Sequence, residues 1–366
     1  PGLIDLGGFL AEPGYSQKGS IESETRAACK GGFTHVCSLP DTQPIADTSA
    51  VVKLILEKSA RSGCTKVLPL GALTQKLAGE QLASMVTLIE AGAVALSNAR
   101  YPIRDSSVMR RLLEYSASFN VPVFLHANDH ALAGNGCMHE GAIATRMGLP
   151  SIPESAETIA LAQILLLVEQ TGANIHISQI SCARSLEMLR DARARGMNIS
   201  ADTPLANLLY TDHAVSGYHS LFNVQPPLRT EKDRLALIAA VESGELAISS
   251  NHRPHELAAK KAPFSDAEAG MSQYDFFFSQ AYTLVEQGHL SLMALIAALT
   301  RKPAQILGLQ HGLQEGNEFH ACLFDANVDV VPTPVMLASR GHNHPALGKT
   351  LTGLVRQVFV AGKPCL

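Results

Sequence analysis

Histidine side chains are the first candidates for chemistry in this sequence, because several lie at spacings that suit a metal site. His252 and His255 are three residues apart, His342 and His344 are two apart, and His126 stands alone. A zinc site needs three or four nitrogen, carboxylate or thiolate donors around one point, at about 2 Å. Bound zinc would lower the pKa of a water molecule and supply the nucleophile for hydrolysis. The 342/344 pair lies near the end of the chain, and we expect it at the surface.

Carboxylates and thiols offer two further kinds of chemistry. Glu12, Asp41 and Asp129 could pair as a general acid and base, and Cys37 and Cys182 could be nucleophiles. We expect the three carboxylates to be solvated or ion-paired in loops. No base beside either cysteine can be identified from the sequence, so we expect both thiols to be buried in the core.

The segments that would position these residues alternate between short β-rich runs and longer runs of helical periodicity. The expected strands are Leu3–Gly7, Thr34–Leu39, Lys66–Gly71, Val94–Ser97, Pro122–His126, Ile175–Ile180, Met197–Asp202 and Leu246–Asn251. The expected helices are Glu22–Lys30, Ser49–Ser62, Ala78–Ala91, Ser106–Ser118, Ser155–Gln170, Arg184–Arg195, Glu231–Ser243, Phe276–Glu286 and Leu292–Leu299. A count of eight strands favours an α/β fold closed into a (β/α)8 TIM barrel over a doubly wound open sheet.

The end of the chain departs from this alternation and consists of short β-like pieces. We expect residues 1–317 to form the barrel and 318–366 to form a small C-terminal β appendage, with strands at His320–Phe324, Val328–Val331 and Val355–Val360. In chains that this one resembles, such a tail completes a small β-sandwich with an N-terminal part. We expect that part to be absent here, because the chain begins at Pro1 and not at methionine.

Composition excludes several classes of protein. A net charge of −4 with interspersed signs gives no footprint for nucleic acid or an anionic membrane surface. The apolar runs are too short to span a bilayer. Seven cysteines without a CxxC pair indicate reduced thiols, so we expect a cytoplasmic protein.

In β/α barrels the reacting groups stand at the carboxyl ends of the strands, here called the mouth. The segment Pro1-Gly2-Leu3-Ile4-Asp5 begins the first strand and leads into Gly7-Gly8-Phe9-Leu10-Ala11-Glu12-Pro13-Gly14. This segment resembles the opening of dihydroorotases of the amidohydrolase superfamily. The resemblance covers essentially the whole chain and continues through Gly31–Thr34, Leu39–Thr42, His126–Asp129, Pro226–Arg229, Asn251–His255, Ala262–Phe264 and Lys302–Ala304.

The departures from this family fall on the residues that it uses to bind metal. The resemblance implies metal positions, with the general base last, at Gly7, Phe9, Asn98 (or Ala99), His126, Gln179 and Asn251. Only His126 keeps the family's residue type. Amides are poor zinc ligands and carry no charge to offset the cation, and Asn251 cannot accept a proton as a base would. We therefore expect no zinc, no other cofactor and no catalysis.

A rebuilt metal site is the alternative, from His126, His176, His252 and His255. Side chains alternate in direction along a strand. If Gln179 faces the mouth, His176 should face away from it, so we do not expect such a site.

The substrate positions implied by the resemblance have changed as well. The family's substrate-binding arginine corresponds to Ala11, an asparagine corresponds to Asp41, and another corresponds to Gln225. Only His255 matches. An arginine grips a carboxylate through two hydrogen bonds, so its loss predicts poor binding of the family's anionic substrate.

The resemblance also suggests a use for a barrel without its chemistry. Bacterial dihydroorotase-like chains that lack the His-x-His pair are associated with aspartate carbamoyltransferase, an enzyme of pyrimidine biosynthesis. The resemblance therefore implies that the present protein is a non-catalytic structural subunit, which holds the catalytic chain of the transferase in its active assembly. We also expect the present protein to form a homodimer or a larger assembly. Two alternatives stay open: a divergent active zinc amidohydrolase acting on dihydroorotate or a hydantoin-like cyclic amide, and a sensor that binds a pyrimidine intermediate in the old pocket. Ala11 and Asp41 speak against the sensor.

Overall fold

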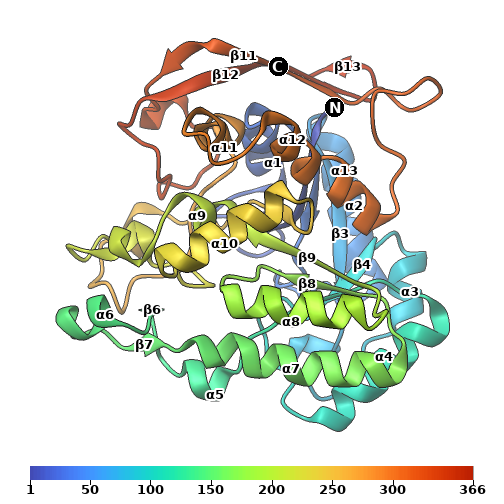
Figure 1. Ribbon diagram of the computed structural model, residues 1–366. Coiled ribbons are helices and arrows are strands. Elements are labelled where there is room, and N and C mark those ends of the chain that lie inside the picture. The colour runs from blue at the N-terminus through green and yellow to red at the C-terminus, as the bar shows by residue number, and fades with distance from the viewer. Residues whose placement is uncertain (366) are drawn as a thin grey trace.

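Eight parallel strands surround the centre of the molecule (Figure 1), in a computed structural model that describes residues 1–365. They are β1 (Leu3–Gly8), β2 (Phe33–Ser38), β3 (Lys66–Ala72), β4 (Ala95–Ser97), β5 (Val123–His126), β8 (Ile175–Ser178), β9 (Ile199–Pro204) and β10 (Ala247–Ser249). Neighbours in this order are hydrogen-bonded in one sheet. The first and last strands meet just beyond their ends, where the amide of Phe9 donates to the carbonyl of His252 at 2.8 Å. The predicted (β/α)8 barrel is confirmed.

Helices cover the outside of this barrel. They are α1 (Ile21–Lys30), α2 (Ser49–Ser62), α3 (Met85–Glu90), α4 (Ser106–Phe119), α7 (Glu154–Thr171), α8 (Ala183–Ala194), α9 (Leu205–Leu209), α10 (Glu231–Glu242), α11 (Phe277–Glu286), α12 (Leu292–Leu299) and α13 (Arg301–Leu307). Local sequence explains several of the ends. Ser20 and Thr230 begin α1 and α10 with reciprocal capping boxes, and Gly63 ends α2 with φ 67°, a left-handed conformation that suits glycine.

The third helix is much shorter than its predicted range of Ala78–Ala91. It begins only at Met85, because Gly79 makes a turn with φ 76° against the loop after β4. A Cβ atom at Gly79 would lie 2.2 Å from the carbonyl oxygen of Pro102. The spacing of apolar residues over Ala78–Ala91 correctly indicates a segment that packs on the barrel, but its first half forms a turn and not a helix.

Between β5 and β8 the chain makes an excursion before it re-enters the barrel. This excursion contains α5 (His130–Ala133), α6 (Ala142–Met147) and the small parallel pair β6 (Met138–His139) and β7 (Ser151–Ile152). In Figure 1 it projects beside α7, away from the C-terminal sheet. Its first residues follow β5 directly, so they stand at the mouth.

The C-terminal segment combines a sheet with a strap. The antiparallel strands β11 (Ala321–Val330) and β12 (Leu351–Val360), with β13 (Lys363–Pro364), form the separate sheet seen at the top of Figure 1, over α11. The two pieces predicted at His320–Phe324 and Val328–Val331 are one strand. The strap between β11 and β12 returns to the barrel, where the amide of Asn343 donates to the carbonyls of Arg253 and Gly270.

One expectation about this strap is wrong. His342 is exposed, but His344 is fully buried, and its Nε2 donates to the carbonyl of Asp275. The pair therefore does not lie together at the surface, because His344 anchors the strap. Among residues 1–365, no helix is both long enough and apolar enough to cross a membrane.

Candidate functional site at the barrel mouth

The centre of the mouth is a very small space of about 20 Å³. Three of the predicted metal positions line it, Gly7, His126 and Gln179. The other lining residues are Leu6, Leu39, Leu70, Ser97, Ala99, Arg100, Ser178, Asp202 and Ser249. A cavity of about 10–15 Å³ is enough to hold one water molecule, so this space has room for about one water molecule.

Arg100 fills the mouth. Its Nη2 donates to Oε1 of Gln179 at 2.9 Å, to Oδ1 of Asn251 at 2.6 Å and to the backbone carbonyl of Gln225. The Nδ2 of Asn251 donates to the same carbonyl at 2.9 Å. A guanidinium cation therefore stands where the family resemblance places a metal, and uncharged amide oxygens surround it.

The charge of Arg100 persists at neutral pH. Burial, and then the nearby positive charge of Arg253, lower the pKa of Arg100 to about 9. That value still leaves the group protonated at pH 7. The amide oxygens supply acceptors for its hydrogen bonds without adding a negative charge, which suits a partly buried cation.

His126 is the one metal position that keeps its family residue, and its environment keeps it neutral. Its Nδ1 lies 3.2 Å from the carbonyl oxygen of Ser178, which can only accept, so Nδ1 carries the hydrogen. Burial, and then the charge of Arg100, lower the pKa of His126 to about 3. This imidazole faces a cation that belongs to the chain itself.

The predicted metal position Asn98 needs correction. Its side chain turns away from the central space, to Oγ1 of Thr74 at 2.7 Å and the carbonyl of Tyr101 at 3.1 Å. Ala99 adopts φ 48°, and this left-handed turn directs the next residue, Arg100, into the mouth. The alternative position at Ala99 therefore matches the geometry.

The remaining predicted positions lie around this centre. Phe9 is buried, with the guanidinium carbon of Arg253 at 4.4 Å from its ring centroid. The same arginine forms an ion pair of 2.7 Å with Asp41. The negative charge expected at Asp41 is therefore matched by a positive one. Gln225 contributes its backbone carbonyl to Arg100, and Ala11 is fully buried.

His255 is buried beside the mouth and not in it. Its Nε2 donates to the carbonyl of Ala269 at 3.0 Å, and its Nδ1 lies 3.3 Å from the ammonium of Lys18. Burial lowers the pKa of His255 to about 4. Both ring nitrogens thus have partners within the protein.

The histidines that could rebuild a metal site are separated. His252 bonds Glu24, and His176 bonds Asp202 on the neighbouring strand at 2.7 Å. The expected orientation of His176 is wrong, since it packs against Phe124 inside the barrel. The alternation argument fails because Gln179 lies beyond the strand with φ 62°. Among residues 1–365, no three or more His, Cys, Asp or Glu side chains are placed to hold a metal ion.

The carboxylates and thiols considered as acids, bases or nucleophiles make structural contacts instead. Glu12 pairs with Lys58 at 2.6 Å, and Asp129 accepts the backbone amides at the start of α5. The thiols of Cys37 and Cys182 are fully buried, and burial raises the pKa of each. These residues match the expectation of ion-paired carboxylates and core thiols.

Comparisons with known proteins place the chain. The family model described as dihydro-orotase-like matches residues 1–185. A dihydroorotase-like protein of Pseudomonas putida is 47% identical over 100% of this chain and 86% of the relative. The chain belongs to the dihydroorotase-like family. A dihydroorotase of Anaeromyxobacter dehalogenans is 38% identical over 99% of this chain and 85% of its own length.

A solved structure supports the fold of this dihydroorotase-like chain. The L-hydantoinase of Arthrobacter aurescens superposes with a TM-score of 0.87 at 21% identity, over 100% of this chain and 84% of its own. A sequence identity of 21% supports a shared fold and no shared function.

Sequence reasoning missed the two arginines that dominate this dihydroorotase-like mouth. Arg100 follows β4 by three residues, and Arg253 follows β10 by four. Arg253 lies within the Asn251–His255 motif of the family resemblance, and Arg100 directly follows the metal position assigned to Asn98 or Ala99. A search for any charged residue just after a strand would have found them, because strand ends converge at the mouth.

Adjacent glycines at the end of β1 give a matched prediction about packing. A Cβ atom at Gly8 would lie 1.9 Å from Oη of Tyr274, whose hydroxyl donates to Asp5 at 2.9 Å. We expect Gly8→Ala to lower the free energy of unfolding by about 1–3 kcal/mol. At Gly7 the nearest atom is Cδ2 of Leu39 at 3.6 Å, so Gly7→Ala should change it by less than about 0.5 kcal/mol. Urea unfolding of both variants checks this, and equal losses would contradict it.

Proposed function

We propose that this dihydroorotase-like protein is a non-catalytic structural subunit for aspartate carbamoyltransferase in de novo pyrimidine biosynthesis. The observation that carries the first half of this proposal is the guanidinium of Arg100 in the mouth, bonded to the amides of Gln179 and Asn251. The second half rests on the resemblance to chains that lack the His-x-His pair.

The donors at the mouth do not fit a catalytic zinc ion. His126 is a single imidazole, and the residues opposite it are amides. A divalent cation at the same centre would lie within a few ångströms of the positive charge of Arg100, where two like charges repel by several kcal/mol. Zinc chemistry supplies an activated water and a polarised carbonyl, and no residue at this mouth replaces either.

The size of the mouth supports the same conclusion. Small-molecule sites in proteins have volumes of about 300–1,000 Å³, whereas the centre of this mouth has about 20 Å³. A cyclic amide could reach the end of the barrel only if Arg100 left it. Departure would break three hydrogen bonds of a charged donor.

Surface composition supports a role in assembly. Neighbouring helices α4 and α7 expose large apolar side chains, among them Phe119 at 55% and Leu166 at 60%. The ring of Tyr115 lies 4.6 Å from that of Phe119 on α4, and Ile159 is a further exposed apolar residue on α7. Exposed apolar side chains of this kind are common at protein contacts.

Metal analysis and an activity assay test the loss of catalysis. The purified protein should hold less than about 0.1 equivalent of zinc, even after incubation with it, and should not interconvert dihydroorotate and carbamoyl aspartate. More than about half an equivalent, together with turnover, would instead establish the divergent active amidohydrolase.

Assembly with the transferase is tested separately. The dihydroorotase-like chain should co-purify with the catalytic chain of aspartate carbamoyltransferase, and the transferase should lose activity when this chain is withheld. A transferase that is fully assembled and active alone would refute the structural role, whatever the zinc content.

A further inference from the structure

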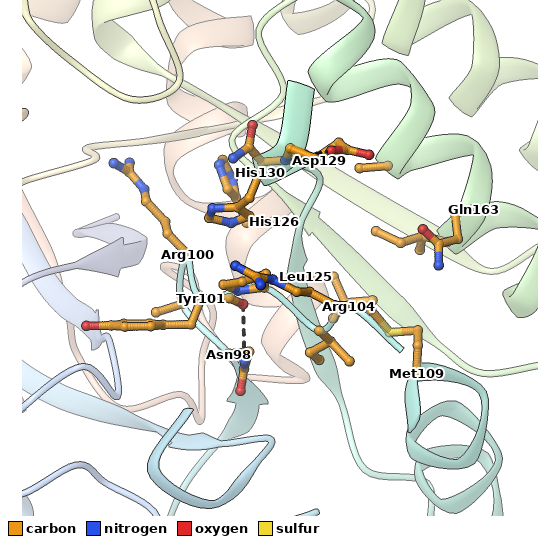
Figure 2. Close-up of a pocket in the computed structure, with 17 residues that line it drawn as sticks. Asn98, Arg100, Tyr101, Arg104, Met109, Leu125, His126, Asp129, His130 and Gln163 are labelled. Atoms are coloured by element: carbon orange, nitrogen blue, oxygen red, sulfur yellow. Dashed lines mark hydrogen bonds between the residues drawn. The ribbon is translucent and has the colours of Figure 1, made fainter. Parts of the chain in front are cut away.

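A larger cavity lies beside the mouth, and none of the residues assigned to the family's substrate lines it. It has a volume of about 460 Å³ and is enclosed by the loop after β4, the start of α5 and the faces of α4 and α7. Figure 2 shows Arg100 along one side of this cavity, with the imidazoles of His126 and His130 beside it. Met109 and Gln163 stand at the other end.

The side of the cavity near the mouth carries two arginines, Arg100 and Arg104, with hydrogen-bond donors that face no acceptor among residues 1–365. Arg100 makes all three of its hydrogen bonds through Nη2, and its Nη1 and Nε have no protein partner among residues 1–365. Arg104 lines the cavity, is exposed, and forms no ion pair or hydrogen bond within the same range. Asp129 is the one carboxylate in the lining, and it already accepts the amides of Ala131 and Leu132.

The cationic side continues into a second, more open cavity of about 400 Å³. Both cavities share Arg100, Arg104 and His130, and the second adds Arg253 with its partner Asp41. Arginine forks match the oxygens of phosphate and carboxylate groups. An anion between these arginines would also offset the repulsion between Arg100 and Arg253, which adds to burial in lowering the pKa of Arg100.

The other side of the cavity is apolar. Met109 from α4, Leu125 from β5 and Ile164 from α7 line it, together with Ile103 and Ala160. A site with an apolar wall and a few converging polar groups is the common form of a small-molecule pocket. A free inorganic ion would leave this wall in contact with water.

We propose that this cavity binds a small amphipathic anion, with a phosphate or carboxylate group at Arg100 and Arg104 and an apolar or aromatic body against α4 and α7. None of the family's substrate positions lines the first cavity, whereas Asp41 and Gln225 line the second. It requires no catalysis. Because Arg100 also bonds Gln179 and Asn251, a bound anion would contact the same side chain that closes the mouth.

Calorimetric titration of the full chain with four probes tests this proposal: phenyl phosphate, benzoate, inorganic phosphate and phenol. We expect phenyl phosphate or benzoate to bind at least about tenfold more tightly than inorganic phosphate or phenol, because only they satisfy both sides of the cavity. Preference for phenyl phosphate identifies a phosphate ligand, and preference for benzoate identifies a carboxylate. Equal binding of all four probes, or none, would overturn the proposal.

Two variants locate the binding. Arg104→Gln should weaken the preferred probe about tenfold, because it removes a charged donor, and should leave folding intact since Arg104 has no partner to lose. Arg110→Gln, on the exposed face of α4 and paired with Glu114, removes the same charge outside the cavity and should leave binding unchanged. Ala160→Leu should weaken phenyl phosphate while inorganic phosphate is unaffected. Equal binding by the two arginine variants would place the anion elsewhere and refute the site.

Discussion

Between pH 7 and pH 5 three histidines that are buried in the neutral form are together expected to lower the free energy of unfolding by about 6 kcal/mol. Burial lowers the pKa of His126 to about 3 and that of His344 to about 4. Burial, followed by the neighbouring His320 and His311, lowers the pKa of His35 to about 3. In an unfolded chain each imidazole has a pKa of about 6.5.

The direction follows from where protons bind. Below pH 6.5 the unfolded chain takes up a proton at each of these histidines and the folded chain does not, so acid favours unfolding. The stabilisation is complete above pH 6.5 and falls by about 1.4 kcal/mol per pH unit per histidine until the folded pKa is reached. Asp5 and Asp275 act in the opposite direction, since burial raises the pKa of each. Three histidines nevertheless amount to a large share of the 5–15 kcal/mol typical of a folded protein.

Urea unfolding at pH 7, 6 and 5 measures this loss. The variant His35→Gln should reduce the slope of unfolding free energy against pH by about 1.4 kcal/mol per unit, whatever it does to stability at pH 7. His342→Gln, which changes an exposed side chain, should keep the slope of the parent protein. A stability that is constant from pH 7 to pH 5 would show that these imidazoles are solvated in the folded state.

The second large effect is expected at Glu24, which is fully buried in α1. Its Oε2 accepts from Nε2 of His252 at 2.9 Å and from the hydroxyl of Ser339 at 2.6 Å, and its Oε1 accepts from the amide of Arg340 at 3.2 Å. Nδ1 of His252 accepts the amide of Gln273 at 2.9 Å, so Nε2 carries the hydrogen that Glu24 binds. One carboxylate thus joins α1, the residues after β10 and the strap.

Removing this carboxylate would leave several buried donors without an acceptor. We expect Glu24→Ala to lower the free energy of unfolding by about 3–5 kcal/mol, as measured by chemical denaturation. Glu22→Ala lies on the same helix but removes an exposed pair with Arg26, and such pairs contribute less than about 1 kcal/mol. Similar losses in the two variants would mean that the buried contacts do not stabilise the fold.

Strand number and order could be predicted from the sequence because apolar runs and their spacing determine them directly. The expected strand at Lys66–Gly71 is observed at Lys66–Ala72, and the helix at Ser49–Ser62 has the predicted bounds. The shortened α3 could not be predicted in this way, because a turn at Gly79 is fixed by contact with a loop that is distant in the sequence.

At the mouth, the sequence identified which family residues had changed but not that Arg100 occupies the place where the family resemblance puts a metal. Three residues that follow strands there adopt left-handed backbone conformations: Ala99 at φ 48°, Gln179 at φ 62° and Asn251 at φ 51°. Each costs about 1–2 kcal/mol in a residue other than glycine, so tertiary contacts must impose it. These turns break the simple alternation of side chains, so alternation did not predict the direction of His176. The choice between Asn98 and Ala99, which the family motif leaves open, depends on the turn at Ala99.

The positive charge at the mouth belongs to the side chain of Arg100, so it is present in the chain from its synthesis onward. Every copy carries one guanidinium, which no chelator can extract and no competing ion can exchange. The hydrogen bonds at this polar centre form as soon as Arg100 reaches Gln179 and Asn251.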